Sequence, residues 1–221
     1  MNDTYQKWLW EKQGQECVEN LKKHAFDAHF VPSAEAAKTL IIDMVKAYES
    51  FGFAGSETTR SIGLLDEIEA MGKTIYDHWQ TDISNWQKNL TKEEMFQVRL
   101  SQGRCDCLLC SANGISLTGE IVNVDGVGNR NAAMTFGPKK VVIVAGMNKV
   151  RRDLQSALDR VQEIAAPPLA NKLGYETPCA ETGFCSDCNS PKRICRITTI
   201  LHRKPLLTDM SVVLVNEALG F

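Results

Sequence analysis

The stretch KVVIVAGMNK, residues 140–149, decides the fold class of this chain. Its first six residues form the purest β-branched run in the sequence, and runs of this kind occur in strands that are buried on both faces, as in a parallel sheet. A glycine, an amide and a lysine follow at once, and a helical pattern begins near Arg151. A buried strand that turns directly into a helix is the building unit of an α/β domain.

The same order of strand, small-residue turn and helix recurs on both sides of this stretch. Alternating or continuous apolar runs predict strands at residues 25–31, 50–54, 73–77, 105–111, 121–124, 194–202 and 211–215. Apolar residues at helical spacing predict helices at residues 4–23, 34–48, from about 60 through 71, 92–100 and 152–165, the last of them stopped by the prolines at 167 and 168. This element order predicts an α/β fold with a largely parallel sheet and helices on both faces.

The N-terminal segment, residues 1–31, is expected to pack as a helix and a first strand on the α/β domain of residues 32–221. The helix should direct Trp8, Leu9, Cys17, Val18 and Leu21 toward the core. The pattern leaves open whether that core belongs to the same chain or to a second copy, so a homo-oligomer is possible.

The charge and hydropathy of the chain exclude some classes of function. With 25 basic and 27 acidic residues, the chain lacks the concentrated positive charge that binding to a nucleic-acid backbone requires. The N-terminus carries charges throughout, unlike a signal peptide, and no run approaches the eighteen apolar residues of a membrane span. We therefore expect a cytoplasmic protein whose thiols stay reduced and available to metals.

Three loops at expected strand ends carry unusual chemistry, and ligands of open α/β sheets bind at the carboxyl ends of the strands. In the first loop, Ser56, Glu57 and Thr58 follow a strand and open a helix, so their backbone N–H groups and hydroxyls could receive an anion. The alternative is an ordinary helix cap.

The second loop is DGVGNRN, residues 125–131. It combines an acceptor, an amide and a fixed cation with two glycines that permit close approach of a ligand; the candidate binding residues are Asp125, Gly126, Gly128, Asn129 and Arg130. A hairpin loop could have the same composition.

The third loop, Gly146, Asn148 and Lys149, leaves the β-branched strand toward a helix N-terminus, where a lysine could hold a carboxylate or a phosphate. A solvated lysine is the alternative. The sequence contains no G-x-G-x-x-G after its first strand and no Walker A motif, so the familiar nucleotide sites have no direct support.

Four of the eight cysteines lie within one short segment, residues 178–196, which also contains Pro178, Gly183 and Pro191. The spacing Cys179-x5-Cys185-x2-Cys188-x6-Cys195 predicts a metal site, because such a short segment cannot build an apolar core and the C-x2-C pair can present two sulfurs from one turn. Only one such pair is present, which favours a [4Fe–4S] cluster over zinc. Two disulfides, separate buried cysteines and one reactive thiol are the other possibilities.

The remaining cysteines and the histidines receive no ligand role. Within a strand, Cys105 and Cys107 point to one face and Cys110 to the other, so we expect them in the core, with Cys110 the one that could reach the site. The four histidines lie in separate elements, and no Ser-His-Asp or Cys-His pairing is recognisable.

Three segments in this order resemble the LUD-domain family, named for lactate utilisation: CSANGISLTGEIVNVDGVGNRNAAMTFGPKKVVIVAGMNKVRRDL (110–154), PCAETGFCSDCNSPKRICRITTILHRKP (178–205) and VVLVNEALGF (212–221). The resemblance covers nearly the whole chain. It implies a Rossmann-like α/β core similar to that of sugar-phosphate isomerases and CoA transferases, with the loops at 125–130 and 146–149 where the related isomerases hold phosphate and sugar. It also implies a role in L-lactate oxidation beside iron–sulfur and other redox subunits, and it brings no defined catalytic residue.

Three functions follow. The first, favoured by the resemblance, is a component of L-lactate utilisation in which the cysteines carry or relay an electron and the loops hold a small carboxylate. The second is a stand-alone isomerase or acyl- or CoA-transferase-like enzyme that acts on a carboxylate or a sugar phosphate, with a structural zinc. The third is a metal- or redox-responsive regulatory protein.

Overall fold

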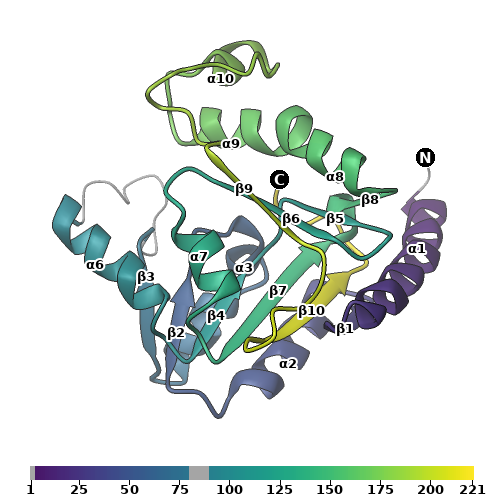
Figure 1. Ribbon diagram of the computed structural model, residues 1–221. Helices are drawn as coiled ribbons and strands as arrows, with labels where there is room; N and C mark the ends of the chain where they lie inside the picture. Colours follow the sequence, from purple (N-terminus) through teal and green to yellow (C-terminus); the bar gives the residue numbers. More distant parts are fainter. Residues whose placement is uncertain (1–2, 80–89) are drawn as a thin grey trace.

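Six parallel strands form the central layer of the computed structural model, which describes residues 3–79 and 90–221 (Figure 1). In spatial order they are β1 (Asp27–Val31), β10 (Asp209–Val215), β7 (Lys140–Gly146), β4 (Cys107–Cys110), β2 (Ser50–Phe53) and β3 (Thr74–Asp77). The β-branched run lies near the middle of this sheet, between β10 and β4. The predicted parallel α/β fold is confirmed.

Strand β7 is apolar from Val141 to Ala145, where both of its faces are buried. Val141 and Ile143 pack into one core and Val142 and Val144 into the other, as expected for side chains that alternate along a strand. Helices α2 (Ala34–Val45) and α4 (Leu64–Ala70) complete the second of these cores. Helices α1 (Asp3–Lys23) and α7 (Asn129–Thr135) contribute to the first.

A second, smaller sheet covers part of the first core. Its spatial order is β8 (Val150–Arg151), β5 (Gly114–Ser116), β6 (Ile121–Asp125) and β9 (Ile197–Leu201). Strand β6 runs antiparallel to both of its neighbours. The strands expected at 121–124 and 194–202 therefore belong to this sheet, whereas β5 and β8 are too short to give a periodic signal in the sequence.

The long helix predicted at 152–165 differs from the structure in where it ends. Helix α8 (Leu154–Arg160) passes through a π-helical turn (Val161–Ala165) into α9 (Ala166–Lys172). The prediction that Pro167 and Pro168 stop the helix is wrong. They occupy the first turn of α9, where a proline loses no hydrogen bond by lacking an N–H group. The π-helical turn just before them has a wider backbone, which lets the helix continue past the prolines.

The helix predicted to run through residue 71 is also two helices. The first is α3 (Glu57–Ser61), and Gly63, with φ of 75°, separates it from α4. A residue in this left-handed conformation cannot continue an α-helix.

Helix α1 packs on its own chain. Cys17 and Leu21 are fully buried, and the Asn20 side chain donates to the Leu117 carbonyl at 2.7 Å. The prediction that Trp8 faces the core is wrong: Trp8 is 57% exposed, and Trp10 packs against the core instead. Trp10 shares the face of Cys17 and Leu21 at helical spacing, whereas Trp8 lies outside it.

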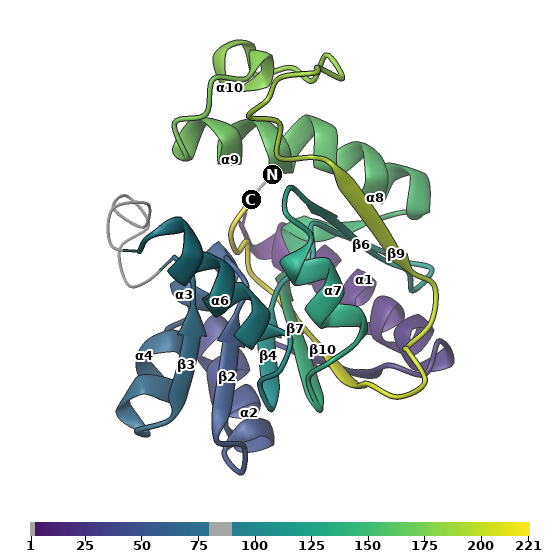
Figure 2. The ribbon, with the colours of Figure 1, turned by 60° about the vertical axis from the view of Figure 1, so that its left-hand side comes forward.

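The last helices cover the carboxyl ends of the parallel strands. Figure 2 shows α8, α9 and α10 (Pro178–Thr182) as a layer at this end of the sheet, with α6 (Lys92–Gln102) beside β2 and β3. Among the described residues, no helix is long and apolar enough to cross a membrane.

Candidate functional site

Two adjoining cavities lie where the parallel strands end and α9 begins to cover them. Their volumes are about 140 Å³ and about 40 Å³. Both are lined by Gly55, Trp79, Asn113, Arg130, Ala165 and Leu169. Because they share these walls, we treat them as one cleft, the strand-end cleft, with a larger and a smaller part. All three of the loops predicted from the sequence contribute to it.

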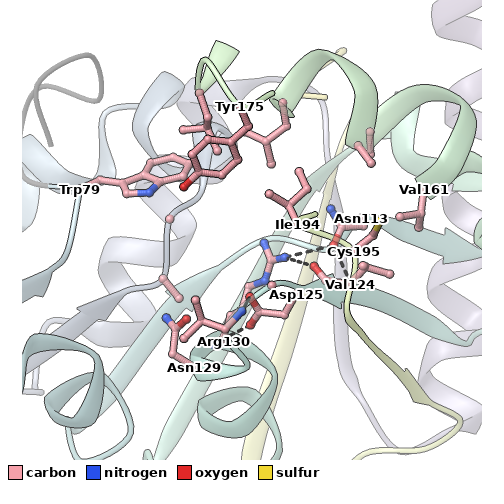
Figure 3. A pocket seen from close by; sticks show the side chains of 18 of the residues that line it. Trp79, Asn113, Val124, Asp125, Asn129, Arg130, Val161, Tyr175, Ile194 and Cys195 are labelled. Atoms are coloured by element: carbon pink, nitrogen blue, oxygen red, sulfur yellow. Dashed lines mark hydrogen bonds between the residues drawn. The ribbon is translucent and has the colours of Figure 1, made fainter. Parts of the chain in front are cut away.

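Arg130, in the first turn of α7, is a central cation of the cleft (Figure 3). Its Nη2 donates to the Val124 carbonyl at 2.7 Å and to Asn113 Oδ1 at 3.1 Å, which fixes the guanidinium. Its Nε is buried without a hydrogen-bond partner. The ordered guanidinium therefore keeps a buried donor available.

Arg99, on α6, lines the larger part of the cleft, and its Nε is likewise buried without a hydrogen-bond partner. Burial lowers the pKa of this guanidinium, although it stays charged at neutral pH. The carboxylate of Asp125 accepts from the backbone N–H groups of Arg130 and Asn131 at 3.0 and 3.3 Å, so it closes the loop that begins α7. Asp125 thus builds the loop that presents Arg130.

Lys149 lies at the smaller part of the cleft, in the 3-10 turn that follows β7, and is 5% exposed. Its Nζ donates to Thr58 Oγ1 at 2.8 Å and to Ser111 Oγ at 3.0 Å. Burial, followed by the charges of Arg160 and Arg130, lowers the pKa of this amine from 10.5 to about 7. Lys149 is therefore partly neutral at physiological pH.

The first loop supplies the surroundings of this lysine. Ser56 caps α3 by accepting from the Thr59 N–H, and the fully buried Thr58 holds the Lys149 amine. Glu57 lines the smaller part of the cleft and pairs with Lys172 at 2.8 Å. One carboxylate oxygen of Glu57, Oε1, is buried without a hydrogen-bond partner.

A chain of side-chain hydrogen bonds runs along the larger part of the cleft. The Asn129 amide donates to Gln102 Oε1 at 2.9 Å, and Gln102 Nε2 lies 3.0 Å from His78 Nδ1. Burial, together with Arg99 and other cations, lowers the pKa of His78 to about 3. His78 is therefore neutral, and the positive charge of the cleft resides on Arg99, Arg130 and Lys149.

The remaining candidates from the second and third loops are three glycines and Asn148. Gly126 lines the cleft, and Gly128 is the N-cap of α7. A Cβ on Gly146 would lie 2.5 Å from Glu217 O, and Asn148 binds the backbone of Leu219 and Gly220. Neither Gly146 nor Asn148 lines the cleft; both hold the C-terminal residues, whose Phe221 does line it.

The four clustered cysteines lie on or beside the cover of the cleft. Cys179 lies in the first turn of α10, Cys185 is exposed in the loop beyond it, and Cys195 lines the larger part of the cleft. Arg193 donates to the carbonyls of both Cys188 and Cys195, at 2.7 and 2.8 Å, and so joins these two positions. In the part of the chain that the structure describes, no three histidine, cysteine or acidic side chains are gathered as metal ligands.

The other cysteines belong to the core. Cys107 and Cys110 are fully buried on opposite faces of β4. Cys105 precedes this strand, and its thiol donates to the carbonyls of Gln102 and Cys107. Burial raises the pKa of Cys105 and of Cys110 to about 12, so both are unreactive thiols.

Several cleft residues could not be found from the sequence. They are His78, Trp79, Arg99, Ser111, Asn113, Tyr175 and Phe221. Each is an isolated residue in its own element, without a motif around it. The available signal was position, since Trp79, Ser111 and Asn113 follow predicted strands at the end where ligands bind.

Comparisons with known proteins agree with this architecture. The chain is similar to a DUF162 family protein from Deinococcus radiodurans of known crystal structure, with 14% sequence identity, a TM-score of 0.52, and coverage of 93% of this chain and 98% of that one. At this identity the likeness concerns the fold alone. No curated protein matches the sequence. The sequence model of the LUD domain matches residues 14–215, so the chain belongs to the LUD domain family.

Proposed function

We propose that this protein is a component of L-lactate utilisation that binds a small carboxylate in the strand-end cleft. The LUD domain family is associated with lactate utilisation, which supplies the context. Two half-buried arginines, Arg99 and Arg130, carry the proposal, because the Nε atom of each is buried.

Both guanidiniums line one cavity, and both keep a buried Nε without a hydrogen-bond partner. Among the described residues neither forms an ion pair with a carboxylate. A buried N–H group without a hydrogen-bond partner is costly, so these two Nε groups favour an anion that accepts hydrogen bonds from them. The fixed fork of arginine suits a carboxylate well.

Isothermal titration calorimetry with L-lactate, pyruvate and inorganic phosphate tests the proposal. Arg130→Gln should weaken carboxylate binding by about 1–3 kcal/mol, as expected for the loss of a charge-assisted hydrogen bond. Arg152→Gln is the matched control, because Arg152 is an exposed arginine with a side chain that is 87% exposed. Equal affinities in wild type and Arg130→Gln, with equal melting temperatures, would remove the anion site.

We also propose that the four cysteines of residues 178–196 bind a metal, an iron–sulfur cluster by preference and zinc as the alternative. The composition of four thiols beside basic residues supports this proposal, and the contact of Cys195 with the cleft would bring such a group near the carboxylate. Among the described residues, the four sulfurs do not lie together as metal ligands. Binding of a metal would therefore require this mostly exposed segment to change its conformation. Carboxylate binding does not depend on it.

Purification without oxygen, followed by a visible spectrum and metal analysis, tests the cysteine proposal. A broad absorption in the visible range indicates iron–sulfur charge transfer and supports a role beside redox subunits, whereas a colourless zinc protein indicates a structural role. Cys185→Ser should abolish metal binding and lower the melting temperature. Ser186→Ala, at the adjacent exposed position, should change neither. Full metal content in Cys185→Ser would exclude the four-thiol site.

A second candidate is a stand-alone isomerase or an acyl- or CoA-transferase-like enzyme with a structural zinc. The lining of the cleft favours it, because Trp79 and Tyr175 border the larger part and offer aromatic surface that a three-carbon acid does not require. Calorimetry with ribose 5-phosphate as the probe separates the candidates. Tighter binding of the sugar phosphate than of lactate or pyruvate would favour the second.

A further inference from the structure

We propose that Lys149 is a nucleophilic amine that forms an imine with the carbonyl carbon of a 2-oxo carboxylate held in the strand-end cleft. The inference rests on the proposed function, since Arg130 must first hold the carboxylate. It adds a covalent step and a substrate class that carboxylate binding alone does not imply.

The position of Lys149 supports this role. Lys149 lines the smaller part of the cleft, and the two hydrogen-bond partners of its Nζ, Thr58 Oγ1 and Ser111 Oγ, are neutral hydroxyls. The anionic side chain of that wall, Glu57, is paired with Lys172. Among described residues, no carboxylate lies within ion-pair range of the Lys149 amine to hold it as an ammonium ion.

Charges from two other elements disfavour the ammonium form further. Arg160 on α8 and Arg130 on α7 repel a positive charge at Lys149, and only Glu57 on α3 favours it. With burial as the largest cause, the pKa falls to about 7. At pH 7 the neutral amine is then about 1,000-fold more populated at Lys149 than at an ordinary lysine.

The cleft also orients the substrate. Arg130 lines both of its parts, whereas Lys149 lines only the smaller part. A carboxylate on Arg130 would therefore place the adjoining carbonyl carbon toward Lys149. A new carbon–nitrogen bond then replaces the carbonyl oxygen, which leaves as water with the two amine protons, so the step needs no oxidant. Glu57, with its unpartnered Oε1 in the same wall, can transfer these protons.

Reductive trapping tests the inference. The full chain is incubated at pH 7 with pyruvate and sodium cyanoborohydride, digested, and analysed by mass spectrometry. We expect one reduced pyruvate adduct, on Lys149, that is lost in Lys149→Met and retained in Lys12→Met, which replaces an exposed lysine of α1. The wild-type peptide map is sufficient by itself if Lys149→Met does not fold.

Calorimetry with pyruvate in the absence of the reductant separates this inference from the proposed function. Pyruvate that binds the wild type but leaves no adduct on Lys149 would overturn the imine and leave the carboxylate site standing. Absence of both binding and adduct would overturn both. An adduct spread evenly over the surface lysines would also overturn the inference, because it would show that Lys149 has no special reactivity.

Discussion

Replacement of Lys149 by methionine should change the stability of this protein in a pH-dependent way. The native lysine has a pKa of about 7, against 10.5 for an ordinary lysine. Each pKa unit corresponds to about 1.4 kcal/mol, so this difference corresponds to about 5 kcal/mol. Where the lysine is charged in both the native and the unfolded state, its charge destabilises the native state by this amount. Methionine fills a similar volume without a charge, so it removes this cost.

The sign follows from proton binding. Below pH 7 the lysine is protonated in both the native and the unfolded state, and the native state bears the full cost. Between about pH 7 and 10.5 the unfolded chain binds the extra proton, so the stability of the wild type rises with pH. Between pH 7 and 9.5 this amounts to about 3 kcal/mol. The variant should not show this rise.

The variant also loses the two hydrogen bonds of the Lys149 amine, which lowers its stability by an amount that does not depend on pH. Thr58 keeps its bond to the Leu219 carbonyl and Ser111 its bond to the Ala112 carbonyl, so the loss is about 1–2 kcal/mol in total. Lys149→Met should therefore exceed the wild type in free energy of unfolding by about 2 kcal/mol or more at pH 6, and the difference should vanish or reverse at pH 9.5.

Urea unfolding of wild type, Lys149→Met and Lys12→Met at pH 6 and 9.5 measures these differences. The exposed Lys12 controls for the loss of one positive charge. A stability difference between wild type and Lys149→Met that is the same at both pH values would show that Lys149 titrates like an ordinary lysine, and the reasoning on its environment would be refuted.

Two further predictions concern residues at the ends of strands in the parallel sheet. Gly146→Ala should lower the free energy of unfolding by about 2 kcal/mol or more, because the new Cβ would lie 2.5 Å from two backbone atoms, Glu217 O and Leu219 N. Urea unfolding measures this change, and a loss below about 0.5 kcal/mol would contradict the prediction. Hydrogen bonds from Lys139, Ser50 and Glu49 lower the pKa of Asp106 to about 2, so Asp106→Asn should cost about 1–2 kcal/mol at pH 7, and the cost should decline as the pH falls from about 4 to 2. An undiminished cost at pH 2, measured by unfolding at both pH values, would contradict this account.

Predictions from the sequence succeeded where a local pattern has a local cause. The run from Val141 to Ala145 could be assigned to a doubly buried strand because its composition suits that environment. The prolines at 167 and 168 misled because a short π-helical turn, which has no sequence signature, lets the helix continue.

The site was predictable in its loops but not in its chemistry. The order of strands and turns placed Arg130 and Lys149 at the carboxyl ends of the sheet, because parallel strands end at the same edge. The hydrogen-bond partners of Lys149, Thr58 and Ser111, are distant from it in the chain, and the charges that lower its pKa come from Arg160 and Arg130.

The amino-acid sequence by itself determined the α/β class, the family and the polar loops, since hydrophobic periodicity and turn residues act over a few neighbouring positions. Only the tertiary structure decided that Lys149 is buried against two hydroxyls and that Arg99 and Arg130 share one cavity. The physical reason is that burial and electrostatic repulsion depend on distances in space, and those distances are set when the sheet brings remote segments together.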